Sequence, residues 1–217
     1  MLISLLLTNP FVFLIVASAL LGAITIHEFA HAFAADKLGD PTPRLHGRLT
    51  LNPLAHLDPI GTILLFIFGF GWGKPVMFDP FNLQNHRRDA AIISFAGPLS
   101  NIIVVIFLAT IYRLGILQNL FPFFPWGVVI ITVVQLNLVL ALFNLIPIHP
   151  LDGGKILVGL LPHKDAIDVD RFLTRWGTII LILMIFPSFG GVSPISAFMS
   201  PIMRFLLNLF IPSLPLA

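Results

Sequence analysis

The residues with the clearest chemical potential are His27, Glu28 and His31, which form the pattern H-E-x-x-H at the end of a long apolar run. On a helix, positions i and i+4 lie on one face, so both imidazoles can bind the same metal ion. Glu28 directly follows His27 and can take a proton from the water that such a metal activates. The spacing therefore predicts a hydrolytic metal site with His27 and His31 as ligands and Glu28 as the general base.

Chance does not easily account for this pattern. Glu28 is the only glutamate in the chain, which holds seven histidines among 217 residues. At this histidine content, histidines at both required positions around one glutamate arise about once in a thousand cases. The alternative is that the three side chains line a helix bundle and bond to neighbouring helices. In a membrane span, where unpaired polar groups are disfavoured, the metal site is the stronger interpretation.

The composition places the motif in a membrane protein. Hydrophobic residues make up 57% of the chain and charged residues 10%, whereas soluble domains average about 25% charged residues. We expect a single all-α, polytopic membrane domain over residues 1–217, with about four to six membrane helices. The net charge of +2 gives no support for nucleic-acid binding, and the lack of cysteine excludes disulfides and thiolate metal sites.

The helix that carries the motif has recognisable ends. Thr8 or Asn9 followed by Pro10 is typical of a helix start, and Gly39 marks the helix end. His31 precedes Gly39 by eight residues, which places the site about 12 Å inside the helix end. No basic residue precedes the apolar run, so we expect a retained span and no cleaved signal peptide.

Further apolar stretches predict the other membrane segments. We expect spans over residues 90–112, 127–147 and 172–186, and a short apolar helix over residues 151–161. Residues 194–211 form either a last short span or a surface helix. Residues 60–70 are apolar but too short to span, which predicts a re-entrant or interfacial segment. We also expect residues 46–51 and 74–78 to pair as a short β-hairpin near the metal site.

The basic residues predict the orientation in the membrane. Of the twelve lysines and arginines, only Arg113 and Arg204 fall on one side of this arrangement. By the positive-inside rule the other side is cytoplasmic. We therefore expect a multi-pass protein of the cell membrane with its N-terminus outside and its metal site toward the cytoplasm.

A hydrolytic zinc site needs a third protein ligand and one open position. The candidates in or near the membrane layer are His56, Asp58, His149 and Asp152. Asp152 is favoured, because prolines interrupt any helix before it and the glycines after it free the backbone to turn the carboxylate. The alternative role for Asp152 is to cap the following helix, which does not exclude ligation. His149 is expected nearer the surface, and His56 and Asp58 lie in a loop where turn and capping roles are common.

Two asparagines stand out within apolar stretches. Asn144 either bonds a neighbouring helix or presents its amide to the backbone of a ligand. Asn101 is expected to hold helices together, with Gly97 permitting a close approach.

With these residues in view, the sequence resembles the site-2 protease family of membrane-embedded zinc peptidases. The resemblance covers about residues 22–160 and rests on H-E-F-A-H at 27–31, R-L-T-L-N-P at 48–53, H-x-D-P-x-G at 56–61, G-W-G-K-P-V at 71–76, G-P-x-x-N at 97–101 and N-x-x-P-x-x-x-L-D-G at 144–153. It implies a short, single-domain member without PDZ or CBS domains, in which the role of the C-terminal helices is unassigned.

The resemblance also implies residue roles. His27, His31 and Asp152 would bind one Zn²⁺, Glu28 would act as the general base, and Asn144 would contact the substrate backbone. Two imidazoles and a carboxylate also suit iron or cobalt, so the choice of zinc follows from ligand type and from the resemblance.

We therefore expect an intramembrane zinc metalloendopeptidase that cleaves peptide bonds in or near transmembrane segments of other membrane proteins. Its partners would be transmembrane protein substrates and the lipid bilayer. The alternatives are a membrane transporter of divalent metals and a non-catalytic relative. A transporter should spread its ligands across the layer, whereas these cluster at one depth beside a candidate base. The complete set of ligands and base argues against a non-catalytic relative.

Overall fold

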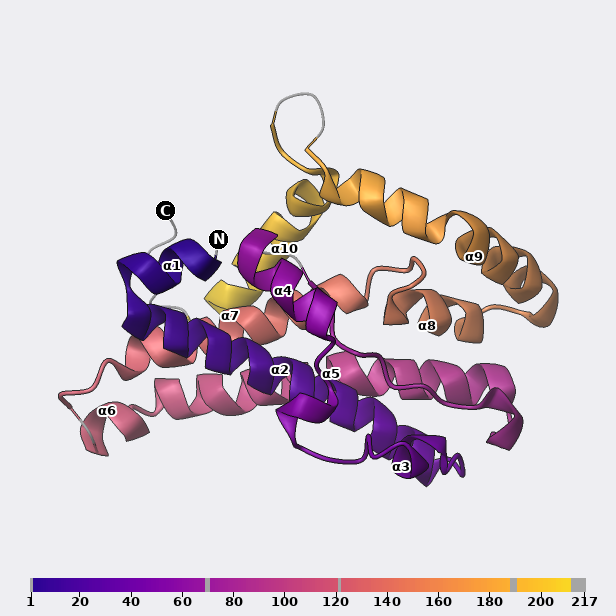
Figure 1. The fold of residues 1–217 in the computed structure, drawn as a ribbon, viewed down its shortest axis with the longest axis horizontal. Coiled ribbons are helices and arrows are strands. Elements are labelled where there is room, and N and C mark those ends of the chain that lie inside the picture. The colour runs from indigo at the N-terminus through magenta and orange to yellow at the C-terminus, as the bar shows by residue number, and fades with distance from the viewer. Residues whose placement is uncertain (1, 69–70, 121, 188–190, 212–217) are drawn as a thin grey trace.

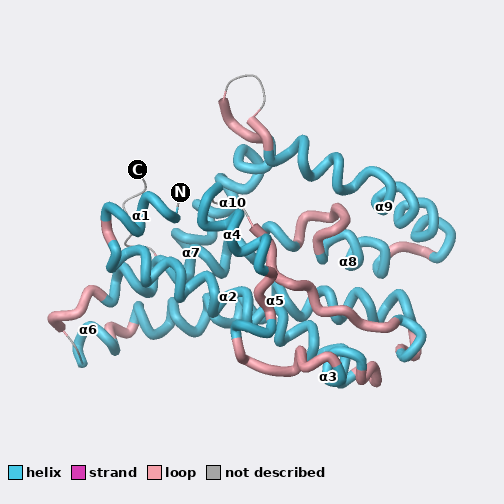
Figure 2. The backbone as a smooth tube through the Cα atoms, viewed as in Figure 1, coloured by secondary structure: helices cyan, strands magenta, loops and turns pink. Residues whose placement is uncertain are grey.

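The computed structural model describes residues 2–68, 71–120, 122–187 and 191–211, and these form helices without a β-strand (Figures 1 and 2). In chain order the elements are α1 (Leu2–Thr8), α2 (Pro10–Lys37), α3 (Thr42–Leu45), the 3₁₀ helix η1 (Pro53–Ala55), α4 (Pro59–Phe68), the 3₁₀ helix η2 (Pro80–Asn82), α5 (His86–Arg113), α6 (Ile116–Leu120), α7 (Trp126–Asn144), α8 (Asp152–Leu160), α9 (His163–Ile185) and α10 (Pro194–Phe210). The expected all-α architecture is confirmed.

Three of the described helices, α2, α5 and α7, are long and apolar enough to cross a membrane. Helix α5 lies at the centre of the molecule, because it contacts α2, α7 and α8 (Figure 1). Helix α8 lies between α5 and α9 and contacts both. The motif-bearing helix α2 and the short helix α8 therefore both pack against the same central helix.

The ends of α2 are the predicted ones. The Asn9 side chain accepts a hydrogen bond from the backbone N–H of Val12 at 3.1 Å, and Pro10 occupies the first helical position. At the other end, Gly39 has a φ of +102°, in the left-handed region where glycine is favoured. Asn9, Pro10 and Gly39 therefore determine where α2 begins and ends.

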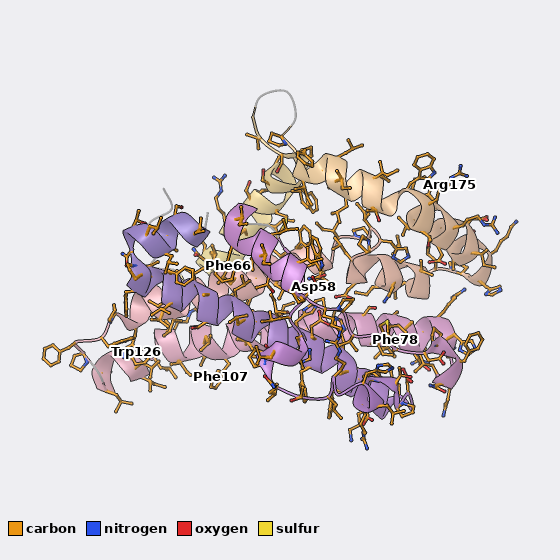
Figure 3. All side chains as sticks on the ribbon, in the orientation of Figure 1. Asp58, Phe66, Phe78, Phe107, Trp126 and Arg175 are labelled. Carbon is orange, nitrogen blue, oxygen red and sulfur yellow. The ribbon has the colours of Figure 1, made fainter. Side chains whose placement is uncertain are left out.

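The helices bury small and branched residues and turn large apolar ones outward. Val105, Val134 and Leu138 form a core between α5 and α7, and Leu207 and Ile211 join α10 to it. Phe107, on the outer face of α5, is 63% exposed (Figure 3). An exposed apolar face of this kind suits a helix that is solvated by lipid.

The expected pairing of residues 46–51 with 74–78 is wrong: among the described residues the structure has one antiparallel bridge, between Leu57 and Gly73, outside both segments. The backbone N–H of Lys74 also donates to the carbonyl of His56 at 2.8 Å. Prolines at the neighbouring positions lack the N–H that a longer ladder would need. The apolar segment 60–70, which is predicted to be re-entrant or interfacial, forms helix α4 up to Phe68, while residues 69–70 lie outside the described part.

Helix α9 begins nine residues earlier than the predicted fourth span, at His163 instead of residue 172. Its buried residues Ala166, Leu173, Gly177 and Leu181 recur at helical spacing. The charged residues between them lie on the other face, so a hydropathy criterion misses the first turns. By contrast, α10 coincides with the predicted segment 194–211 to within one residue.

Candidate metal centre

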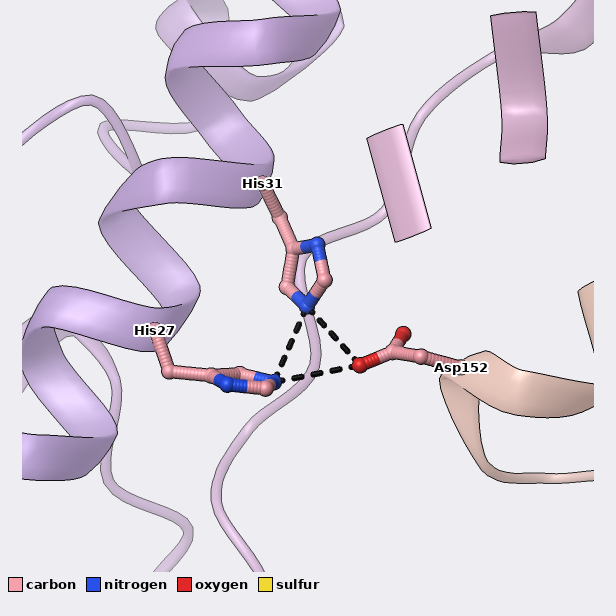
Figure 4. A group of neighbouring side chains, drawn as sticks. All are labelled: His27, His31 and Asp152. Carbon is pink, nitrogen blue, oxygen red and sulfur yellow. Dashed lines mark hydrogen bonds and ion pairs between the residues drawn. The ribbon is translucent and has the colours of Figure 1, made fainter. Parts of the chain in front are cut away.

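His27 and His31 project from one buried face of α2. Their Nε2 atoms lie 3.0 Å apart, and the residues are 3% and 7% exposed (Figure 4). Ala23 and Ala35, on the same helix, are also buried. Small side chains at these positions let α5 approach closely enough to enclose both imidazoles.

Asp152 reaches the histidines from the first turn of α8. Its Oδ2 atom lies 3.1 Å from Nε2 of His27 and 3.2 Å from Nε2 of His31 (Figure 4). Leu151 occupies the N-cap position and no side chain caps this helix, so the capping role considered for Asp152 is wrong. Gly153 permits the tight turn, because a Cβ there would lie 2.3 Å from the carbonyl oxygen of Ile146.

The hydrogen bonds on the far side of each ring define which nitrogen carries the proton. Nδ1 of His31 lies 2.7 Å from the carbonyl oxygen of Ile93, which can only accept. Nδ1 of His27 lies 2.7 Å from Oδ1 of Asn101. Both Nδ1 atoms therefore donate, and in the neutral imidazoles both Nε2 atoms direct a lone pair toward Asp152.

When both imidazoles are neutral, the three converging atoms are all acceptors, and this is the most informative feature of the site. The two Nε2 atoms and Oδ2 of Asp152 are separated by 3.0, 3.1 and 3.2 Å. Acceptors this close repel one another unless a cation lies among them. The ligands of a tetrahedral zinc ion, at bond lengths of about 2.0–2.1 Å, are about 3.3 Å apart. Two imidazoles and one carboxylate at these separations fit Zn²⁺.

Gly97 forms a wall of this pocket. A Cβ built on Gly97 would lie 2.4 Å from Nε2 of His31 and 2.7 Å from Nε2 of His27. The missing side chain therefore leaves space where the two ligand atoms meet. Such close approach of a helix backbone explains why glycine stands at this position of α5.

Glu28 is half-buried and lies on α2 next to His27. Its Oε2 atom accepts a hydrogen bond of 3.1 Å from the backbone N–H of Val76. Val76 belongs to an extended segment that follows Gly73 and lies outside the helices. The carboxylate is therefore oriented by backbone from a loop, whereas the histidines are oriented by helix α5.

Asn144 ends α7 and is half-buried. Its side-chain N–H donates to the carbonyl of Leu140 at 3.0 Å, within the same helix. The side-chain N–H of Asn144 therefore bonds within its own helix, and not to a neighbouring helix as one of the two proposed roles requires.

The other candidate ligands lie elsewhere. His56 is buried and its Nε2 lies 2.8 Å from the carbonyl oxygen of Thr50. Asp58 accepts from the backbone N–H of Gly61 at 2.8 Å, at the start of α4. His149 lies 3.0 Å from a carboxylate oxygen of Asp170 on α9. The structure thus brings only Asp152 of the four candidates to His27 and His31.

Sequence reasoning missed three contributors to this site. Asn101 was expected to hold helices together, and its bond to His27 was not foreseen. Gly97 was expected to permit a close helix contact, but its place beside the ligand atoms was not foreseen. Its position one helical turn before Asn101 puts both residues on the same face of α5, which is a signal that the sequence contains. The N–H of Val76 carries no sequence signal, because every residue except proline has one.

Comparison with known proteins connects the chain to a group of metalloproteases. Residues 117–184 match the model of peptidase family M50. The Bacillus subtilis protein named “Putative zinc metalloprotease YwhC” is 38% identical over 179 residues, which cover 77% of this chain and 78% of that protein. “Putative zinc metalloprotease Rip2” of Mycolicibacterium smegmatis is 30% identical over 185 residues, which cover 80% and 67%.

A more distant relative is “Zinc metalloprotease MJ0392” of Methanocaldococcus jannaschii, 30% identical over 143 residues that cover 65% of this chain and 33% of that protein. No solved structure matches the chain.

Proposed function

The chain belongs to peptidase family M50, the site-2 protease family of membrane zinc metalloproteases, and from this premise we propose that it is an intramembrane endopeptidase. It hydrolyses peptide bonds in or near the transmembrane segments of other membrane proteins. His27, His31 and Asp152 hold the zinc ion, and Glu28 is the general base.

One observation carries the assignment of the ligands. Three acceptor atoms from two helices meet within 3.2 Å of one another in a buried pocket, beside a glutamate. A structural cluster of polar side chains would pair donors with acceptors. With both imidazoles neutral, these three acceptors have no donor between them and instead call for a cation.

The chemistry divides between the metal and the chain. When bound, zinc would act as a Lewis acid that activates water and polarises the scissile carbonyl. Glu28 takes the proton from the attacking water and returns it to the leaving amine. The Val76 N–H fixes the orientation of the Glu28 carboxylate through a hydrogen bond. Asn101 and Ile93 hold the two imidazoles so that their Nε2 atoms face the metal.

The substrate must also be unwound, because a transmembrane helix hides its peptide bonds in its own hydrogen bonds. The extended segment after Gly73 runs beside Glu28 and offers backbone groups to an added strand. Asn144, at the end of α7, can exchange its bond to Leu140 for one to a substrate carbonyl. Both features support presentation of an extended substrate at the metal centre.

The orientation forms part of the proposal. The basic residues that gather around the α2 C-terminus and the α8–α9 region favour placing that end in the cytoplasm. The metal centre then lies toward the cytoplasmic face of the cell membrane.

The test is Glu28→Gln, which keeps the size and polarity of the side chain and removes the base. We expect proteolysis to fall by about 10²- to 10⁴-fold while zinc stays bound. Membranes of cells that express the wild type or the variant are compared by proteomics, and substrates should accumulate uncut in the variant. Equal cleavage by both proteins would refute Glu28 as the base.

A second experiment separates a protease from a metal transporter. In proteoliposomes, a transporter would move zinc across the bilayer, and the wild-type protein is expected not to. Zinc uptake that depends on His27 and His31, together with unchanged proteomes, would favour transport over hydrolysis.

A further inference from the structure

The two histidines of the metal centre are held in different ways. Nδ1 of His31 donates directly to the backbone carbonyl of Ile93, which a helix fixes in place. Nδ1 of His27 donates to a side chain, Asn101 of α5, at 2.7 Å. An amide side chain can rotate and can present either oxygen or nitrogen, so something else must fix its orientation.

Two acceptors fix the orientation of the Asn101 amide. Its Nδ2 lies 3.1 Å from the carbonyl oxygen of Ala23 on α2. It also lies 2.8 Å from Oδ1 of Asn137 on α7. Since a backbone carbonyl can only accept, Nδ2 must face Ala23, and Oδ1 must face His27.

Asn137 is fixed in turn by its own helix. Its Nδ2 donates to the carbonyl of Val133 at 2.8 Å, which leaves Oδ1 to accept from Asn101. Both asparagines are buried, at 0% and 1% exposure, so water does not compete for these bonds. An uninterrupted series of hydrogen bonds thus runs from Val133 through both amides to His27.

We propose that Asn101 and Asn137 are positioning residues for the metal centre, which set the tautomer and ring orientation of His27 from helix α7. Because each amide donates through Nδ2, its Oδ1 is left to accept from the next residue in the series. His27 therefore donates from Nδ1, and Nε2 of the neutral ring directs its lone pair at Asp152. This inference rests on the proposed zinc site. It goes beyond helix–helix contact, because contact alone does not require a defined amide orientation.

The experiment measures zinc affinity of the purified full-length protein in detergent, by competition with a chelator of known affinity. Asn101→Leu removes the acceptor for His27 but keeps the number and branching of the side-chain heavy atoms, and Asn101→Asp keeps an acceptor. Asn137→Leu removes the support of the Asn101 amide. Thr25→Val is the matched control, because Thr25 is buried on α2 but bonds only the carbonyl of Leu21.

We expect Asn101→Leu to weaken zinc binding by about 10- to 100-fold, and Asn137→Leu by a smaller factor of about threefold to tenfold. Asn101→Asp should bind zinc much more tightly than Asn101→Leu, and Thr25→Val should match the wild type. Equal losses in Asn101→Leu and Asn101→Asp, or no loss in Asn101→Leu, would overturn the proposal. If the wild type itself binds no zinc, the proposed function fails first, so the two failures are distinguishable.

A second measurement uses the zinc-loaded wild-type protein, so its result does not depend on whether a variant folds. In ¹⁵N-histidine NMR spectra, both ligand histidines should carry a proton on Nδ1 and coordinate through Nε2. A ligand histidine that coordinates through Nδ1 would contradict the series of hydrogen bonds described above.

Discussion

The metal side and the base side of this centre are built differently. His27, His31 and Asp152 come from α2 and α8, and helix α5 holds both imidazoles through buried hydrogen bonds that Asn101 and Ile93 accept. Glu28 is held by one backbone N–H of an extended segment. The proposed metal ligands are thus held by helices, whereas the proposed base is oriented by a segment outside the helices.

That segment is fixed at its ends. Upstream, Lys74 bonds to the carbonyl of His56, and the buried Arg48 donates to the carbonyl of Lys74 at 3.3 Å. Downstream, the Asp79 N–H donates to a carboxylate oxygen of Asp40 at 2.8 Å. Val76, whose N–H bonds to Glu28, lies between these two ends.

The largest effect is expected on the metal side, for Gly97→Ala. The added methyl group would lie 2.4 Å from Nε2 of His31 and must displace a ligand or the helix. Zinc affinity, measured by chelator competition, should fall by about 100-fold or more. Gly22→Ala is the control, because a Cβ at Gly22 meets nothing within 4 Å. Equal zinc affinity in the two variants would mean that α5 does not form the wall of the pocket.

A smaller effect is expected on the base side, for Val76→Pro. Proline removes the N–H that orients Glu28, so we expect a loss of about tenfold in kcat, with unchanged zinc content. Val76→Ala keeps the N–H and should retain activity. If Val76→Pro lost zinc as well, the base side would not be separable from the metal side, and the comparison drawn above would fail.

The smallest effect concerns the downstream end of the segment. Asp40 accepts from Thr42, Asp79 and Asn82. Burial raises the pKa of Asp40, but the hydrogen bonds from Thr42, Asn82 and Asp79 outweigh it, so the pKa lies below its ordinary value of 3.8. Because the pKa of Asp40 is lower in the folded protein, its carboxylate stabilises the fold at pH values above the ordinary pKa of 3.8. This stabilisation is lost as the pH falls through the pKa of the folded state.

Asp40→Ala should therefore lower the free energy of unfolding by about 1–3 kcal/mol at neutral pH, and the difference from the wild type should shrink in strong acid. Thermal unfolding in detergent at several pH values measures it. Arg44→Gln breaks an ion pair with Asp36 whose arginine is 63% exposed, and should change stability by less than about 1 kcal/mol. A difference that grew as the pH fell would contradict the assignment.

The parts that the sequence predicts well are governed by local chemistry. Asn9 and Pro10 start α2, and Gly39 ends it, because capping and backbone freedom depend on neighbouring residues only. The spacing of His27 and His31 places them on one face for the same reason. The early start of α9 was missed because its first turns are charged on one face, and hydropathy averages both faces together.

The parts that could not be predicted depend on contacts between distant residues. The bond from Asn101 to His27 joins positions 74 residues apart, and no local pattern shows that these helices meet there. The expected pairing of residues 46–51 with 74–78 also depends on contacts between distant residues, and it does not form. Prolines in this region lack the N–H that a ladder needs, and one bridge, between Leu57 and Gly73, is present among the described residues. A single sequence indicates which residues are chemically unusual, whereas the fold decides which of them meet.

The most direct test of the metal centre compares Asp152→Ala with His149→Ala. Both residues were candidate third ligands, but His149 pairs with Asp170, and Asp152 faces both histidines. Metal analysis after exposure to a mild chelator should find one zinc ion per chain in the wild type and in His149→Ala, and little zinc in Asp152→Ala. Normal zinc in Asp152→Ala would contradict the account.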